Sequence, residues 1–220
     1  MDYMAQRGYD VYLVDLRGYG RSTRPPEMSK PAMGWYTAQN NDKVNKLVLY
    51  APQWIRNTGP ALTDSGGPLG AYRSVSMDSA KARWLTGVPE DKKATLIPPG
   101  WFEAWSAATL ATDPVGSKME KPVLRAPNGT VQDTRDFWGA GKALYDPGLI
   151  RVPTFLAHAE WDADLPSYML HAYFAKLTNV PYKRYVEIGE GTHTIIMEKN
   201  RMQLFAAVQQ FLDEDIRPNQ

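Results

Sequence analysis

Two loops of this chain carry side chains that could pass a proton between them. Asp162 follows a β-branched and aromatic run at residues 153–158, and His193 follows a similar run at residues 183–188. Because open α/β sheets bind ligands at the carboxyl ends of their strands, we expect both side chains to reach one site. An acid and then a histidine, in this chain order, are two members of an Asp-His-nucleophile relay.

In such a relay the histidine takes the proton of the nucleophile, while the carboxylate orients the imidazole and stabilises its charged form. Asp164 and Glu160 lie beside Asp162 and are the alternative acids. His158 falls within a predicted strand and is interpreted as a core residue, whereas His171 falls in a predicted helix and is assigned to packing or the surface. The three histidines are therefore not expected to form a metal site.

The elements that must position these loops alternate between strand and helix at both ends of the chain. Residues 1–52 and 148–220 are predicted to form two parts of one α/β core. A helix is expected to begin at the cap residue Ser167, and a last amphipathic helix is expected at residues 198–213. Strands rich in β-forming residues are predicted at 9–15, 44–51, 153–158 and 183–188.

The middle of the chain, residues 53–147, differs from both ends in composition and in the periodicity of its apolar residues. Glycine and proline are frequent there, helical patches occur at 77–85 and 101–111, and no strand periodicity is evident. We interpret this segment as a helical lobe inserted before the acid-bearing strand and packed over the sheet. Four tryptophans of the lobe favour an apolar or aromatic ligand: Trp84, Trp101, Trp105 and Trp138.

Composition excludes several classes of protein. Lys and Arg number 25 and Asp and Glu number 24, which gives a net charge of +1, and the charges are interspersed. No basic patch for nucleic acid or an anionic membrane is therefore expected. The sequence has no cysteine, no membrane-spanning run and no pattern of a secretion signal, so a cytoplasmic protein is predicted.

Five segments of the sequence carry motifs in a fixed order. They are Asp15-x-Arg17-Gly18-x-Gly20-x-Ser22 after a strand, Lys43-Val44 leading into residues 47–52, the helical insertion, Asp162-x-x-x-Pro166, and Gly189-x-Gly191-x-His193. With these segments the chain resembles the α/β-hydrolase family over nearly its whole length. The resemblance implies a mostly parallel sheet flanked by helices, Asp162 as triad acid, His193 as general base, and residues 53–147 as a cap over the acyl pocket.

The nucleophile elbow of that family, Gly-x-Ser-x-Gly, has no match in the sequence. Residues 21–43, where it should lie, are too few for two helices, a strand and the elbow at about 10 to 12 residues per helix. The oxyanion loop and first strands would precede residue 1. At residues 31–36 a proline-rich loop passes abruptly into the interior of a helix, which indicates a junction where a segment is omitted. We therefore expect an incomplete sheet in which segments of a longer hydrolase are omitted, and no activity from these 220 residues alone.

One serine motif could supply a nucleophile but is discounted. Asp64-Ser65-Gly66-Gly67-Pro68 is similar to the nucleophile motif of trypsin-like proteases, in which the histidine precedes the serine in the chain. All three histidines of this chain follow Ser65. The segment is therefore interpreted as an ordinary loop, in which serine, glycine and proline are common.

Three functions remain open. The first is a hydrolase of small to medium carboxylic esters, which uses a serine outside these residues, needs no cofactor and forms an acyl-enzyme. The second is a noncatalytic remnant that binds a small ligand or a partner. The third is an epoxide or haloalkane hydrolase with an aspartate nucleophile, which the acid and base cannot distinguish from the first.

Overall fold

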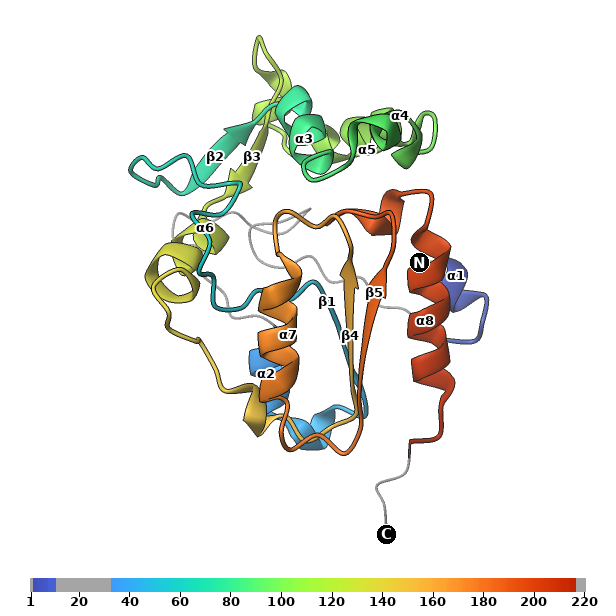
Figure 1. The fold of residues 1–220 in the computed structure, drawn as a ribbon. Coiled ribbons are helices and arrows are strands. Elements are labelled where there is room, and N and C mark those ends of the chain that lie inside the picture. The colour runs from blue at the N-terminus through green and yellow to red at the C-terminus, as the bar shows by residue number, and fades with distance from the viewer. Residues whose placement is uncertain (1, 11–32, 217–220) are drawn as a thin grey trace.

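Three parallel strands form the centre of the molecule. The computed structural model describes residues 2–10 and 33–216. Strands β1 (Leu47–Tyr50), β4 (Thr154–Ala159) and β5 (Lys183–Ile188) pair in the order β1-β4-β5 (Figure 1). All six residues of β4 are buried, as expected for a central parallel strand with a continuous apolar run.

Helices cover both faces of this sheet (Figure 1). Helices α2 (Met33–Gln39) and α7 (Ser167–Lys176) lie on one face, and α1 (Asp2–Ala5) and α8 (Arg201–Asp213) lie on the other. Alternation along β4 divides the core accordingly, because successive strand side chains point to opposite faces. Leu156 packs in the cluster that contains Met169, Leu170 and Tyr173 of α7, while Phe155, Ala157 and Ala159 pack with Leu204 and Phe211 of α8.

The inserted segment lies over the carboxyl ends of the strands (Figure 1). It contains helices α3 (Met77–Trp84), α4 (Lys93–Leu96) and α5 (Trp101–Ala111), then α6 (Gly129–Asp133) and a π-helical turn at Thr134–Trp138. Helices α3 and α5 match the predicted helical patches. Short 3-10 turns also occur in the described residues, at Asn41–Lys43, Glu90–Lys92, Gly116–Lys118, Pro147–Leu149 and Ile195–Met197.

The expectation of a lobe without strands is wrong. Strands β2 (Tyr72–Val75) and β3 (Leu124–Pro127) pair as a two-stranded antiparallel sheet within the inserted segment. Each strand has only four residues, too few to show a period in the sequence. A contact from outside the two strands stabilises β3: the buried carboxylate of Asp113 accepts hydrogen bonds from the guanidinium and the backbone N–H of Arg125.

Helix α7 begins one residue earlier than the predicted cap at Ser167 implies. Ser167 is the first residue of the helix rather than its cap; Pro166 holds the cap position, and no side chain caps the helix. Proline suits this place because its ring fixes φ, and because the start of a helix makes no use of the backbone N–H that proline lacks. The predicted strand at 9–15 and the motif at 15–22 lie almost wholly outside the described residues, and the junction at 31–36 lies partly outside them.

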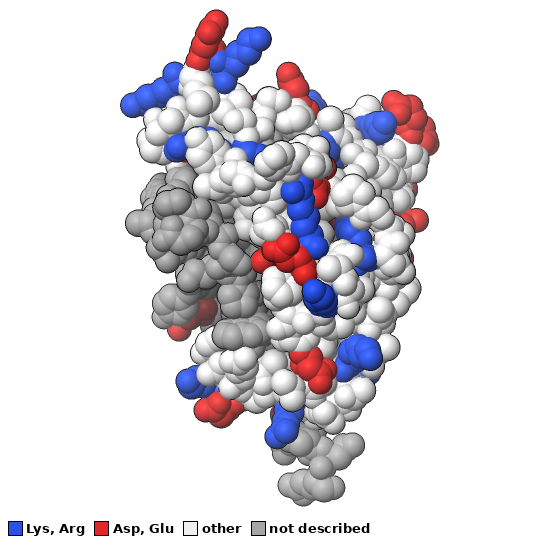
Figure 2. Space-filling view, turned by 90° about the vertical axis from the view of Figure 1, so that its left-hand side faces the viewer, with Lys and Arg blue, Asp and Glu red and all other residues white. Residues whose placement is uncertain are grey.

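Charged side chains are mixed on the surface. On the face shown in Figure 2, acidic and basic groups lie close together rather than in separate fields. In the described ranges, no helix combines the length and the apolar character that a membrane span requires.

Candidate active site

The loops that follow β4 and β5 lie side by side at the carboxyl edge of the sheet. The register pairs Ala159 with Ile188, the last residues of the two strands. Beyond that pair, the N–H of Glu160 donates to Ile188 O at 3.0 Å and the N–H of Trp161 donates to Gly191 O at 2.8 Å. Backbone pairing therefore continues into the loops and fixes one against the other.

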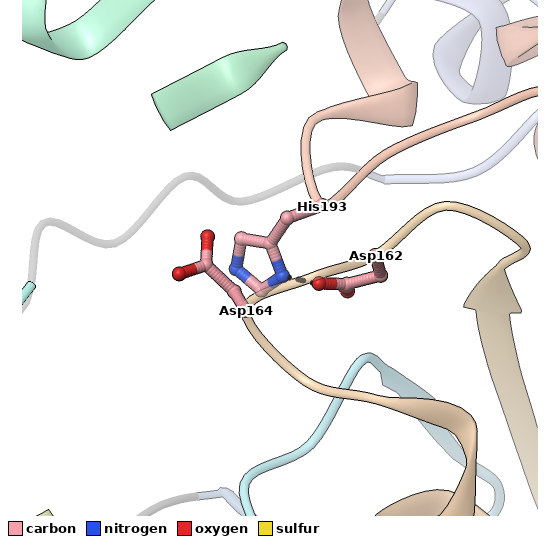
Figure 3. A group of neighbouring side chains, drawn as sticks. All are labelled: Asp162, Asp164 and His193. Atoms are coloured by element: carbon pink, nitrogen blue, oxygen red, sulfur yellow. Dashed lines mark hydrogen bonds and ion pairs between the residues drawn. The ribbon is translucent and has the colours of Figure 1, made fainter. Parts of the chain in front are cut away.

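Asp162 and His193 meet across these loops (Figure 3). The Nδ1 atom of His193 lies 2.8 Å from the Oδ2 atom of Asp162, and the other carboxylate oxygen accepts the N–H of Leu165 at 2.9 Å. The Asp162 side chain is fully buried, whereas 36% of the His193 side chain is exposed. An ionised carboxylate accepts only, so Nδ1 carries the proton in this pair and the lone pair of neutral imidazole lies on Nε2.

The surroundings of His193 favour its charged form. Burial lowers the pKa of His193, but the hydrogen bond and charge of Asp162, together with the charge of Asp164, outweigh burial and raise it above its ordinary value. Arg83 acts in the opposite direction. An imidazole that is stabilised when it gains a proton is suited to general base chemistry.

The two alternative acids have other partners. Asp164 lies on the side of the imidazole opposite Asp162 (Figure 3) and forms an ion pair with Arg83 of α3 at 2.7 Å. Glu160 accepts the backbone N–H of Glu190 at 2.9 Å. Of the three acids named from the sequence, Asp162 is thus the one that the structure joins to His193 by a hydrogen bond.

Asp162, Asp164 and His193 also offer ligand atoms within 4.8 Å of one another. A cation bound there would have to break the Asp162–His193 hydrogen bond and displace the guanidinium of Arg83 from Asp164. The donor set therefore suits proton transfer better than metal binding.

The other two histidines lie where the sequence suggested. His158 is buried; its Nδ1 lies 3.0 Å from Glu187 Oε2 and its Nε2 lies 2.8 Å from Leu165 O. That second bond joins β4 to the far end of the loop that carries Asp162, residues 160–166 and called the acid loop. His171 is exposed on α7 and packs edge-on against Tyr185.

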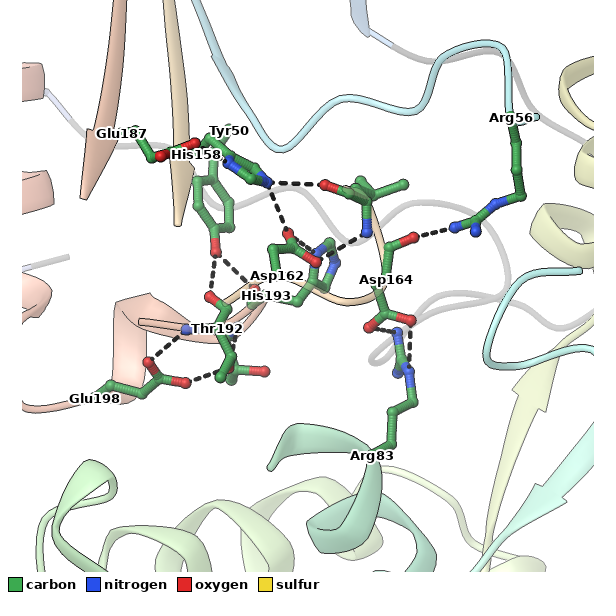
Figure 4. Close-up of polar contacts among 12 residues, drawn as sticks. Tyr50, Arg56, Arg83, His158, Asp162, Asp164, Glu187, Thr192, His193 and Glu198 are labelled. Carbon is green, nitrogen blue, oxygen red and sulfur yellow. Dashed lines mark hydrogen bonds and ion pairs between the residues drawn. The ribbon is translucent and has the colours of Figure 1, made fainter. Parts of the chain in front are cut away.

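Two further side chains support the loop that carries His193, residues 189–194 and called the base loop, and they were not found from the sequence (Figure 4). The hydroxyl of Tyr50 donates toward Thr192 O at 3.1 Å and His193 O at 2.7 Å. The carboxylate of Glu198 accepts the N–H of Thr192 at 2.9 Å. Burial, with the nearby charges of Asp162 and Glu198, raises the pKa of Tyr50, so this hydroxyl keeps its proton and remains a donor.

A cavity of about 520 Å³ opens beside His193. Its walls come from the base loop, the acid loop, α3 and the two-stranded sheet, and they include Trp84, Trp105 and Ser65. Of the other two tryptophans named from the sequence, Trp138 packs in the core against Trp54, and Trp101 is exposed at the surface. The cavity is thus partly aromatic, with a histidine in its wall.

The inserted segment touches the acid loop closely. Gly87, which follows α3, has a φ of +87°, and a Cβ at this position would lie 2.6 Å from Trp161 O. Only glycine combines this left-handed backbone with such an approach. The lobe therefore packs directly on the loop that carries Asp162.

Solved structures share the fold of this chain. A serine hydrolase involved in carbazole degradation aligns with 81% of this chain, at 15% identity and a TM-score of 0.50. The alignment covers 58% of that protein. The 2-hydroxy-6-oxo-6-phenylhexa-2,4-dienoate hydrolase of Rhodococcus sp. strain RHA1 aligns with 82% of this chain at 10% identity and a TM-score of 0.53, which covers 59% of it. A thermophilic esterase of Thermogutta terrifontis aligns with 90% of this chain at 16% identity and a TM-score of 0.50, which covers 77% of it.

These likenesses define the class of fold. The chain has the α/β-hydrolase fold, a mostly parallel sheet flanked by helices, and the fold expected from the sequence motifs is confirmed. It spans about three fifths of the length of the first two of these structures. No family model matches the sequence, and no curated protein matches it.

Proposed function

We propose that this chain carries the acid and the base of a hydrolase for small to medium carboxylic esters. The observation that carries the proposal is the 2.8 Å hydrogen bond between Asp162 and His193, with His193 in the wall of a cavity of about 520 Å³. A volume of this size is typical of sites for small organic molecules. Trp84 and Trp105 in the walls favour an apolar or aromatic acyl group.

In this mechanism Asp162 orients His193, and His193 removes the proton of a serine hydroxyl. The serine attacks the ester carbonyl, His193 returns the proton to the leaving alkoxide, and an acyl-enzyme remains. His193 then removes a proton from water, which attacks the acyl carbon. As the bond between that carbon and the serine oxygen breaks, His193 returns the proton to the serine oxygen, which releases the carboxylic acid and the free serine. Neither metal nor cofactor takes part in these steps.

The nucleophile is proposed to come from residues outside the 220, because the sequence contains no Gly-x-Ser-x-Gly motif. Loss of the serine alone costs on the order of a million-fold in turnover in a related relay. We therefore expect the 220-residue chain to be inactive toward esters by itself. A cytoplasmic location stays a prediction of the sequence.

The test compares the 220-residue chain with the product of its whole reading frame on p-nitrophenyl esters of short acyl chains. We expect hydrolysis by the longer product only, abolished by His193→Ala and retained by His171→Ala, a control at an exposed histidine of α7. Retained hydrolysis in the His193→Ala variant would refute the base assignment.

A second candidate follows from the same missing motif. If the reading frame encodes only these 220 residues, the cavity serves binding rather than catalysis. Trp84 and Trp105 lie in its walls, so a small aromatic ester should quench tryptophan fluorescence in a saturable way. Saturable quenching without turnover would favour the binding function.

A further inference from the structure

Glu198 is a buried acid that the proposed chemistry does not use. It lies between the 3-10 turn Ile195–Met197 and helix α8, and its exposed fraction is 0%. A carboxylate in such a place costs free energy unless hydrogen bonds compensate for the lost water. What these bonds hold in place is therefore informative.

Three donors converge on this carboxylate, and Figure 4 shows the two that Thr192 supplies. The indole N–H of Trp84 donates to Oε1 at 2.7 Å, the backbone N–H of Thr192 donates to Oε2 at 2.9 Å, and the Thr192 hydroxyl bonds to Oε1. Burial raises the pKa of Glu198, and the bonds from Thr192 and Trp84 only partly offset that increase. Two of the three bonds hold the residue that directly precedes His193.

Tyr50 of β1 contacts the base loop as well, through backbone carbonyls that Glu198 does not contact. Tyr50 donates to the carbonyls of Thr192 and His193, while Glu198 accepts the N–H of Thr192. The N–H and the C=O of Thr192 are thus both held by side-chain groups, one of them half-buried and the other buried. These bonds hold the backbone from which the His193 side chain reaches Asp162.

Trp84 connects this loop to the inserted segment. It is the last residue of α3, it is buried, and it also lines the cavity. Nearby, the N–H of Lys199 donates to Leu96 O at the end of α4, so the residue after Glu198 is anchored to the same segment. The carboxylate therefore bridges a cavity wall and the base loop.

We propose that Glu198 is a positioning residue that holds His193 against Asp162 through Thr192, and that Trp84 makes this hold depend on the placement of α3. The role of His193 as base rests on the proposed function, but the positioning itself concerns only the contacts above. A loosened Asp162–His193 bond lowers the pKa of His193, because that bond raises it. The titration of His193 therefore reports the hold without any turnover.

The test measures the titration of the three histidine imidazoles by NMR in the 220-residue protein, with His193 assigned through a His193→Ala variant. Glu198→Gln keeps the shape of the side chain but places an NH₂ group against donors. We expect its His193 midpoint to fall by about half a pH unit or more. Glu103→Gln, the same change at an exposed site on α5, should leave the midpoint in place.

Two further variants separate geometry from charge. Trp84→Phe and Thr192→Val each remove one donor and leave the Glu198 carboxylate intact, so a lower His193 midpoint in both reports a displaced loop. They also decide the question if Glu198→Gln does not fold. The proposal is overturned if folded Trp84→Phe and Thr192→Val keep the wild-type His193 midpoint. Absence of ester hydrolysis contradicts the proposed function alone, since these midpoints do not depend on turnover.

Discussion

The Nδ1 atom of His193 lies 2.8 Å from the Oδ2 atom of Asp162, while Asp164, two residues along the same loop, is held by Arg83 on the opposite side of the ring. One imidazole thus lies between two carboxylates with different partners. The difference gives each acid a distinct effect on the base.

Asp162→Asn should lower the pKa of His193 more than Asp164→Asn does. Asp162 acts through both a hydrogen bond and its charge, whereas Asp164 acts through charge alone. NMR titration of the two variants measures the order directly. A larger drop in the Asp164 variant would show that the sequence-based choice of acid is wrong.

Stability should depend on pH through His193. Its pKa is raised in the folded state, so the folded protein binds this proton more tightly than the unfolded chain does. The resulting stabilisation is complete below the unfolded pKa of about 6.5 and is lost as pH rises through the folded pKa. Urea unfolding of wild type and His193→Gln across this range checks the difference, with His171→Gln as the exposed control. A difference between wild type and His193→Gln that grows with rising pH would contradict the sign.

Arg83→Gln should raise the pKa of His193, because the guanidinium lowers it. The ion pair with Asp164 is partly solvated, with 42% of the Arg83 side chain exposed, so we expect a stability loss below about 1 kcal/mol. Titration and urea unfolding of one preparation measure both effects. A large stability loss with an unchanged His193 midpoint would assign Arg83 a purely structural role.

Gly87→Ala should destabilise the contact between the lobe and the acid loop. Gly100→Ala is a matched control, since Gly100 has a φ of +78° but has no neighbour within 4 Å of an added Cβ. Left-handed strain costs both variants about 1 to 2 kcal/mol. Gly87→Ala should lose more, because its Cβ would also meet Trp161 O at 2.6 Å. If thermal or urea unfolding shows equal losses of stability in the two variants, the lobe can shift away from Trp161 without loss of free energy.

The sequence predicted the elements whose signal is local and long enough. Strand β5 matches its predicted bounds, and β4 is displaced by one residue, because both are continuous runs of strand-forming residues between turns. Tyr50 and Glu198 could not be recognised. One reads as the end of a strand and the other as the start of an amphipathic helix. Tyr50 bonds to His193, more than a hundred residues away, and Glu198 joins Thr192 to the equally distant Trp84 only in the folded chain.

The pairing of β4 with β5 has a consequence for how easily this site can be lost. One register step along a strand is about 3.3 Å, which exceeds the 2.8 Å that separates His193 from Asp162. A slip of a single residue between these strands would also turn their side chains to the opposite face. Substitutions deep in the sheet that loosen this alignment would therefore separate Asp162 from His193 while leaving every residue of both loops unchanged.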